Sequence, residues 1–236
     1  MKIFNRELKI PLQAELPLLF MILYLPAYLG QGKGLPFAYF DLPAVHFQII
    51  IISILYSLLI LYLTDNIPLN EDSPPPGPGL DKSYALPSFR EFALTLSALT
   101  IIYLSINVAV PVISKLNGNE LSGNPIVLTK KIMLLPCLIS CLFSAMQEEL
   151  FFRGYGFYRL KESGFAPQTA MILISLFFAA GHFYEGFHAF VYALLAGLFL
   201  TWRIQKGASL FSLIPAHALL NFTIILLNFL SEGKEL

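Results

Sequence analysis

An apolar run that begins near Ile132 ends in the sequence Gln147-Glu148-Glu149-Leu150-Phe151-Phe152-Arg153. Two adjacent carboxylates and a guanidinium therefore lie where the neighbouring sequence predicts a membrane helix. A charged side chain at the bilayer centre costs on the order of 2.5–3.5 kcal/mol on insertion scales. We therefore expect such a group only where it pairs with another polar group, lies in a water-filled cavity or takes part in a reaction. We expect the rest of the chain to be organised around this stretch.

Helix geometry gives the two glutamates different surroundings. Glu149 and Arg153 are four residues apart, with the acid before the base, so they share a face in the favourable order. Glu148 is turned about 100° from Glu149, since a helix has about 3.6 residues per turn. We predict that Arg153 neutralises Glu149 and that Glu148 remains available as a catalytic residue. The alternative is an internal ion-pair network that only holds helices together.

The composition is that of a polytopic membrane protein. Of the 236 residues, 56% are hydrophobic and 13% are charged, and the mean hydropathy is +0.69. Soluble domains carry about 25% charged residues. The 15 basic residues balance the 15 acidic ones, so nothing indicates a nucleic-acid surface. We predict one compact all-α bundle.

Apolar runs predict about seven membrane helices, with six to eight as the range. The first run has a signal peptide as its competing interpretation, but no clear small-x-small cleavage site follows it. The excess of Lys and Arg favours an N-terminus on the inside. The expected helices cover residues 16–29, 47–63, 92–113, 132–161, 168–183, 187–202 and 210–230.

The chain divides into two parts at about residue 130. Residues 1–130 hold the first three helices and a solvated linker at 65–90, which includes Pro74-Pro75-Pro76-Gly77-Pro78-Gly79. A glycine-asparagine loop is expected at 117–124. Residues 131–236 hold the remaining helices. Within them Cys137 and Cys141 are predicted to be small apolar packing residues.

Three further polar residues are unusual inside predicted membrane helices: His182, His217 and Asn221. His217 and Asn221 are four residues apart and point the same way from the last helix. Glu148 lies 17 residues before Phe165, in the expected turn, and His182 lies 17 residues after it. Antiparallel helices rise equally along their axes, so Glu148 and His182 should meet at one depth.

These four side chains indicate water activation. A carboxylate in an apolar site takes up a proton readily, and a histidine beside it can share that proton or hold the water. A second histidine and an amide supply donors for a developing oxyanion. The set Glu148, His182, His217 and Asn221 therefore predicts a hydrolase of acyl bonds inside the membrane.

Other interpretations of these polar residues stay open. Glu148, His182 and His217 are also a possible zinc-ligand set, although no His-Glu-x-x-His occurs and an amide is a poor zinc ligand. Glu185 and His188 are predicted to be loop and helix-start residues, with a role at the site entrance as the alternative. Asn107 is predicted to donate a hydrogen bond between helices.

At these residues the sequence resembles the CAAX protease and bacteriocin-processing family (CPBP or ABI family), intramembrane endopeptidases related to type II CAAX prenyl endopeptidases. The family's three motifs correspond here to Glu148-Glu149-Leu150-Phe151-Phe152-Arg153, Phe178-Ala179-Ala180-Gly181-His182 and His217-Ala218-Leu219-Leu220-Asn221. Each motif is weak alone, but their joint presence in order is specific. The resemblance covers about residues 132–230 and leaves the first 130 residues unassigned.

The resemblance implies roles for the motif residues. Glu148 and His182 would activate water, His217 and Asn221 would stabilise the oxyanion, and Glu149 and Arg153 would support them. It implies that residues 131–236 are a catalytic core acting on a membrane-anchored or lipidated protein or peptide. It favours a metal-free, glutamate-dependent mechanism over a zinc-dependent one.

The resemblance does not fix the substrate, and a bacterial inner membrane is the expected location. A non-catalytic immunity or scaffold protein of the same fold is the alternative function. A transporter with a proton relay is disfavoured, because the sequence shows no inverted repeat and no glycine-broken helix pair.

Overall fold

The computed structural model describes residues 2–3, 6–7, 12–25, 39–65, 86–117 and 128–232. A short antiparallel pair, β1 (Lys2–Ile3) and β2 (Arg6–Glu7), comes first, and the rest of the described chain forms helices and the turns between them. The α-helices are α1 (Leu12–Leu23), α3 (Pro43–Asp65), α5 (Phe89–Asn117), α6 (Leu134–Glu149), α7 (Phe157–Glu162), α8 (Pro167–Ala180), α9 (Phe187–Gln205) and α10 (Leu210–Glu232). Short 3-10 turns are η2 (Tyr39–Asp41), η3 (Lys131–Met133) and η5 (Phe183–Glu185).

The predicted polytopic helix bundle is confirmed. Five described helices are long and apolar enough to cross a membrane, and two shorter apolar helices, Ala14–Leu23 and Pro167–Ala180, complete the set of seven. The first helix begins earlier than predicted, at Leu12, and the end of its predicted range lies outside the described residues. The five long segments are Pro43–Thr64, Phe89–Ala109, Lys131–Glu162, Phe187–Gln205 and Leu210–Ser231.

The outer face of the bundle is apolar. In the membrane-length window of α5 only 11% of the residues are buried inside the molecule, although the window is strongly hydrophobic. Phe47, Leu55 and Ile101 are each more than half exposed on the outside of their helices. Large apolar side chains that face outward on several helices fit a lipid environment, where they cost nothing to expose.

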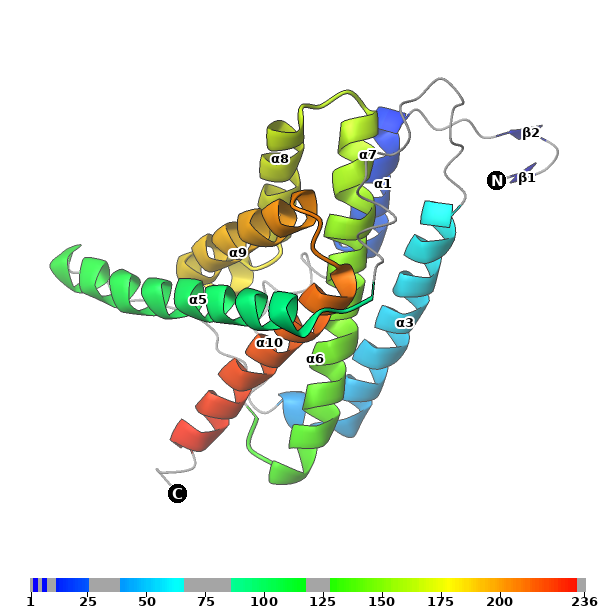
Figure 1. The fold of residues 1–236 in the computed structure, drawn as a ribbon. Coiled ribbons are helices and arrows are strands. Elements are labelled where there is room, and N and C mark those ends of the chain that lie inside the picture. Colours follow the sequence, from blue (N-terminus) through cyan, green and yellow to red (C-terminus); the bar gives the residue numbers. More distant parts are fainter. Residues whose placement is uncertain are drawn as a thin grey trace.

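A long helical rod from Lys131 to Glu162 runs through the middle of the molecule (Figure 1). The sequence predicted one continuous α-helix over 132–161. The rod is continuous, but its central part is a seven-residue π-helix, η4 (Leu150–Gly156), between α6 and α7. The prediction of regular α-helical winding was therefore wrong in this stretch. Short π-helical segments occur often at functional sites, and this one follows directly after the paired glutamates.

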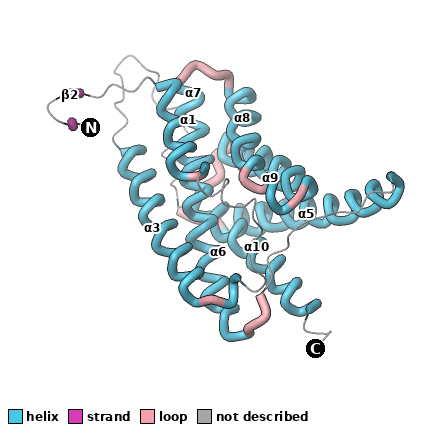
Figure 2. The backbone as a smooth tube through the Cα atoms, turned by 180° about the vertical axis from the view of Figure 1, so that it is seen from behind, coloured by secondary structure: helices cyan, strands magenta, loops and turns pink. Residues whose placement is uncertain are grey.

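The other helices surround this rod. α3 and α10 pack along α6, α8 pairs with α9, and α5 crosses α10 and α9 (Figures 1 and 2). Two glycines allow close approach. A Cβ atom at Gly156 would lie 2.8 Å from Ile174 Cδ1 of α8, and one at Gly197 of α9 would lie 3.1 Å from Ser175 Cβ. Small residues at these contacts let the backbones approach, as in other membrane bundles.

Two predicted loops fall mainly outside the described residues. They are the proline-rich linker at 65–90, of which 66–85 are not described, and the loop at 117–124. The division at residue 130 remains a sequence-based prediction. α5, which lies before that division, packs on α9 and α10 and so contributes to the cavity described next.

Candidate active site

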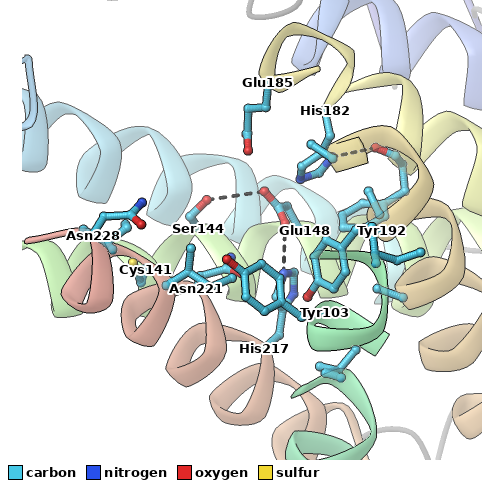
Figure 3. A pocket seen from close by; sticks show the side chains of 18 of the residues that line it. Tyr103, Cys141, Ser144, Glu148, His182, Glu185, Tyr192, His217, Asn221 and Asn228 are labelled. Carbon is cyan, nitrogen blue, oxygen red and sulfur yellow. Dashed lines mark hydrogen bonds and ion pairs between the residues drawn. The ribbon is translucent and has the colours of Figure 1, made fainter. Parts of the chain in front are cut away.

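A cavity of about 570 Å³ lies among α5, α6, α9, α10 and the end of α8. All four predicted site residues, Glu148, His182, His217 and Asn221, line it (Figure 3). They come from three segments that are far apart in the sequence. Glu148 and His182 are equally far in sequence from the turn at Phe165, which predicted that they lie at one depth. In the structure both line the same cavity.

Glu148 faces the cavity from the last turn of α6. Its side chain is 22% exposed, and its Oε1 accepts a long hydrogen bond of 3.4 Å from the Ser144 hydroxyl. Its Oε2 lies 3.8 Å from His217 Nε2 and has no hydrogen-bond partner among the described residues. This carboxylate oxygen is therefore a buried acceptor without a hydrogen-bond donor among the described residues.

Glu149 points away from the cavity and is completely buried. As predicted, it pairs with Arg153, whose Nη1 donates to Glu149 Oε1 at 3.0 Å. The Arg153 guanidinium also lies over the Phe178 ring, 4.3 Å from its centroid. The same Oε1 accepts a 2.9 Å hydrogen bond from His217 Nδ1. Sequence reasoning missed this last contact, because it joins helices whose relative rotation the spacing does not define.

His182 lies in a turn, not in the helix that was predicted to run to residue 183. α8 ends at Ala180, and the chain turns through Gly186, which has a φ of +108° that favours glycine. His182 Nδ1 lies 3.1 Å from the Phe178 carbonyl oxygen. A carbonyl only accepts, so we assign the proton to Nδ1, which leaves the Nε2 lone pair available as a base.

His217 and Asn221 occupy successive turns of one face of α10, as predicted. His217 is 5% exposed and is enclosed by the two glutamates and the Phe178 ring, whose centroid lies 6.1 Å from its own. Asn221 lines the cavity beside it (Figure 3). Both side chains line the same cavity.

The remaining wall combines polar and aromatic side chains. Tyr103 of α5 and Tyr192 of α9 pack edge to face, with ring centroids 5.5 Å apart. Sequence reasoning did not single out either tyrosine. Ser144 could have been found, since it is four residues before Glu148 and so lies on the same helical face. Asn228, also missed, lies seven residues after Asn221.

Other predictions near the cavity had mixed outcomes. Glu185 lies in η5 and His188 in the first turn of α9, as predicted, and both line the cavity. The interhelical role predicted for Asn107 was wrong, because its amide donates to the Tyr103 carbonyl one turn earlier in α5 at 2.9 Å. Cys137 and Cys141 are free thiols packed in a small apolar cluster, as predicted.

The geometry also bears on the zinc alternative. Within the described part of the chain, no three His, Cys, Asp or Glu side chains form a group that could hold a metal ion. Glu148, His182 and His217 share the cavity wall, with His217 Nδ1 directed to Glu149 and His182 Nδ1 directed to the Phe178 carbonyl. A histidine that ligates zinc commonly makes a hydrogen bond of this kind with its other ring nitrogen, so these contacts are compatible with either mechanism.

Residues 130–223 match the family model described as Type II CAAX prenyl endopeptidase Rce1-like. This segment of the chain is similar to the Rce1-like family. The Rce1-like segment includes all four cavity residues and the Glu149–Arg153 pair, so the match and the geometry coincide. The match supports a CAAX-type intramembrane protease at the general level, and the long apolar helices support an integral membrane protein. No curated protein and no solved structure matches the chain.

Proposed function

We propose that this protein is an intramembrane endopeptidase that hydrolyses a peptide bond in a membrane-anchored or lipidated protein or peptide. The observation that carries the proposal is the convergence of Glu148, His182, His217 and Asn221 on one cavity inside an apolar helix bundle. Burying such a polar set in a membrane is costly, so its retention favours a reaction there.

In the proposed first step, Glu148 and His182 activate a water molecule. The Glu148 carboxylate, which lines the cavity, accepts a proton from the water, while His182 Nε2 orients the water by accepting its other O–H. A bond then forms between the water oxygen and the scissile carbonyl carbon, and the carbonyl π electrons move to its oxygen. His217 and Asn221 donate hydrogen bonds to the oxyanion that forms.

In the second step the tetrahedral intermediate collapses. The carbonyl re-forms, the C–N bond breaks, and the proton held by Glu148 passes to the leaving nitrogen. The products are a carboxylic acid and an amine, and the transfer of the proton to the leaving nitrogen returns Glu148 to its ionised starting state. The acid product then loses its own proton to water. No co-reactant other than water is required.

The proposed mechanism uses no metal ion. The support is the chemistry and grouping of the side chains: the partner of His217 one turn on is Asn221, whose amide is a poor zinc ligand, and among the described residues no three His, Cys, Asp or Glu side chains form a group that could hold a metal ion. The zinc-dependent alternative would use Glu148, His182 and His217 as ligands. We further propose a bacterial inner membrane as the location.

The test is cleavage of membrane-anchored and lipidated peptides by purified protein in liposomes. Wild type is compared with Glu148→Ala, His182→Ala and His217→Ala, each with and without a strong zinc chelator. We expect Glu148→Ala to lose at least about 10²-fold in kcat, the lower range for general base catalysis, and the chelator to have no effect. Loss of wild-type turnover with chelator and its return with zinc would establish the zinc alternative.

The same panel tests the non-catalytic alternative. Thermal unfolding in detergent shows whether each variant is folded. If folded wild type and folded variants are equally inert on a broad set of anchored substrates, the protease proposal fails. An immunity or scaffold role would then explain the chain better.

A further inference from the structure

We infer that Glu185 is a specificity residue, which binds the positively charged side chain of a substrate lysine or arginine within about three residues of the scissile bond. The inference rests on the proposed function and deepens it, because it names a feature of the substrate. Glu185 takes no part in the chemical steps proposed above.

Glu185 lies one turn away from His182, the residue that orients water in the proposed mechanism. The backbone N–H of Glu185 donates to the His182 carbonyl oxygen at 3.2 Å, within the 3-10 turn η5. Successive Cα atoms are about 3.8 Å apart, so the Cα atoms of these two residues are at most about 11 Å apart. Extended peptide residues advance by about 3.3–3.6 Å each, so a substrate residue opposite Glu185 lies within about three residues of the reacting carbonyl.

The turn presents the Glu185 side chain to the cavity. Phe183 and Phe187, on either side of it in the sequence, are each more than half exposed. Glu185 is half-buried and lines the cavity. Figure 3 shows its carboxylate pointing inward, on the side of Glu148. The same turn thus exposes apolar rings and directs a charge into the cavity.

The Glu185 carboxylate has no partner within the described part of the chain. Two other acidic side chains show the contrast. Glu15 pairs with Arg159 at 2.6 Å, and Glu149 has its own arginine at 3.0 Å. Glu185 makes no ion pair and no side-chain hydrogen bond with any described residue. A carboxylate that is partly withdrawn from water and unpaired is costly, and a cation that pairs with it offsets much of that cost.

The cavity as a whole has an excess of acidic groups. Among the described residues that line it are Glu148 and Glu185, but no lysine and no arginine. Three histidines also line it, and a histidine is a cation only when it is protonated. Acidic groups in a cleft with low-dielectric walls attract cations and repel anions. A basic side chain fits better than a metal ion, because no three His, Cys, Asp or Glu side chains of the described residues form a group that could hold one.

A simpler explanation is that Glu185 only stabilises the start of α9. It lies two residues before Phe187, the first residue of that helix, and negative charge near a helix N-terminus is favourable. Under that explanation Glu185→Gln would lower the unfolding temperature and would affect every substrate alike. Under the inference, the same variant changes the discrimination between charged and neutral substrates.

The kinetic experiment uses full-length protein in liposomes and anchored peptides that differ at one position. Mass spectrometry of the products locates the scissile bond in a neutral peptide, and lysine, glutamine or glutamate is then placed at successive positions on either side of it. We expect kcat/KM at one position to be about 10-fold or more higher for lysine than for glutamine, as for hydrogen bonds to charged groups. Glu185→Gln should abolish this preference and still cleave the neutral peptide. Glu185→Lys should reverse the preference in favour of glutamate.

Glu162→Gln is the matched control, because it is the same substitution at an exposed residue of α7 that does not line the cavity. It should keep the preference for lysine. A wild type that cleaves lysine and glutamine peptides equally at every position would overturn the inference and leave the proposed function standing. A preference that survives in Glu185→Gln would do the same.

A binding measurement decides the inference without turnover. Full-length Glu148→Gln protein in liposomes keeps Glu185 and removes the other carboxylate among the described residues that line the cavity. Fluorescence titration with the same peptides should give a Kd about 10-fold lower for lysine than for glutamine, and equal values once Glu185→Gln is added. Equal values from the start would overturn the inference. A binding preference for lysine in a wild type that cleaves no peptide would overturn the proposed function and leave the cation-binding role standing.

Discussion

At the scale of the residue, two adjacent glutamates have opposite environments. Glu148 faces the cavity and keeps one carboxylate oxygen without a protein partner, whereas Glu149 is fully buried and holds two donors. The difference comes from a rotation of about 100° between neighbours on a helix. The same rotation places Ser144 beside Glu148 and Arg153 beside Glu149. In the proposed mechanism Glu148 reacts, while Glu149 contacts Arg153 and His217.

Asn221 tests the residue-scale account of the oxyanion donors. Asn221→Ala removes one donor, and we expect kcat to fall by about 10²–10³-fold with little change in KM. Asn228→Ala is the matched control, because Asn228 is the same residue type on the same helix and lines the same cavity. It should keep nearly wild-type kcat. Equal losses in the two variants would contradict a specific role for Asn221.

At the scale of the element, the π-helical segment η4 decides how the rod meets its neighbours. All seven of its residues are buried, and the five that are not glycine are each at most 3% exposed. Gly156 meets Ile174 of α8 and Leu16 of α1, both within 3.2 Å of where a Cβ atom would lie. A small residue is therefore needed where three helices meet.

Gly156→Ala tests this contact. The added methyl would lie 2.8 Å from Ile174 Cδ1, so we expect a loss of about 1–3 kcal/mol in the free energy of unfolding, as for other overpacked sites. Adding Ile174→Val removes the clashing Cδ1 atom and should recover part of the loss. Thermal unfolding in detergent measures both. Additive destabilisation in the double variant would contradict the proposed clash.

At the scale of the whole molecule, buried polar contacts join helix ends that are distant in sequence. Asp41, just before α3, accepts hydrogen bonds from the backbone amides of Thr129 and Lys130 at 2.9 and 3.0 Å and from the Thr129 hydroxyl. Nearby, the buried His46 ring contacts the Ser140 hydroxyl of α6 at 2.8 Å. These contacts connect the start of α3 with the first half of α6 and the residues before it, at the lower end of the view in Figure 1.

The pH dependence of stability tests the Asp41 contact. Burial alone raises the pKa of Asp41, but the hydrogen bonds from Thr129 and Lys130 outweigh it and hold the pKa below its ordinary value of 3.8. The ionised form is therefore the stabilising one. Its contribution is fully present above pH 3.8 and is lost as the pH falls through the lowered pKa of the folded state.

We expect Asp41→Asn to lower the free energy of unfolding by about 1 kcal/mol at pH 7, the difference between hydrogen bonds to charged and neutral acceptors. The gap between wild type and variant should close in acid, below the lowered pKa. Thermal unfolding in detergent at several pH values provides the comparison. A gap that stayed constant down to strongly acid pH would contradict a role for the ionised carboxylate.

Much of this architecture can be predicted from local patterns along the chain. Apolar runs identify the helices because a span of lipid requires about 20 apolar residues, and spacing of four residues identifies the Glu149–Arg153 pair and the shared face of His217 and Asn221. Equal distances from a turn place Glu148 and His182 at one depth, because every helix rises by the same amount per residue. These features depend only on separation along one helix or across one turn.

The contacts between helices depend on the tertiary structure. The bond from His217 to Glu149, the tyrosines of α5 and α9 in the cavity wall, and the π-helical winding after Glu149 have no counterpart in sequence spacing. Each depends on how a helix is rotated about its axis and which neighbour it meets, and packing of the whole bundle decides both. The sequence alone therefore identifies the polar residues of the site, and the fold decides which of them face the cavity and which hold the others in place.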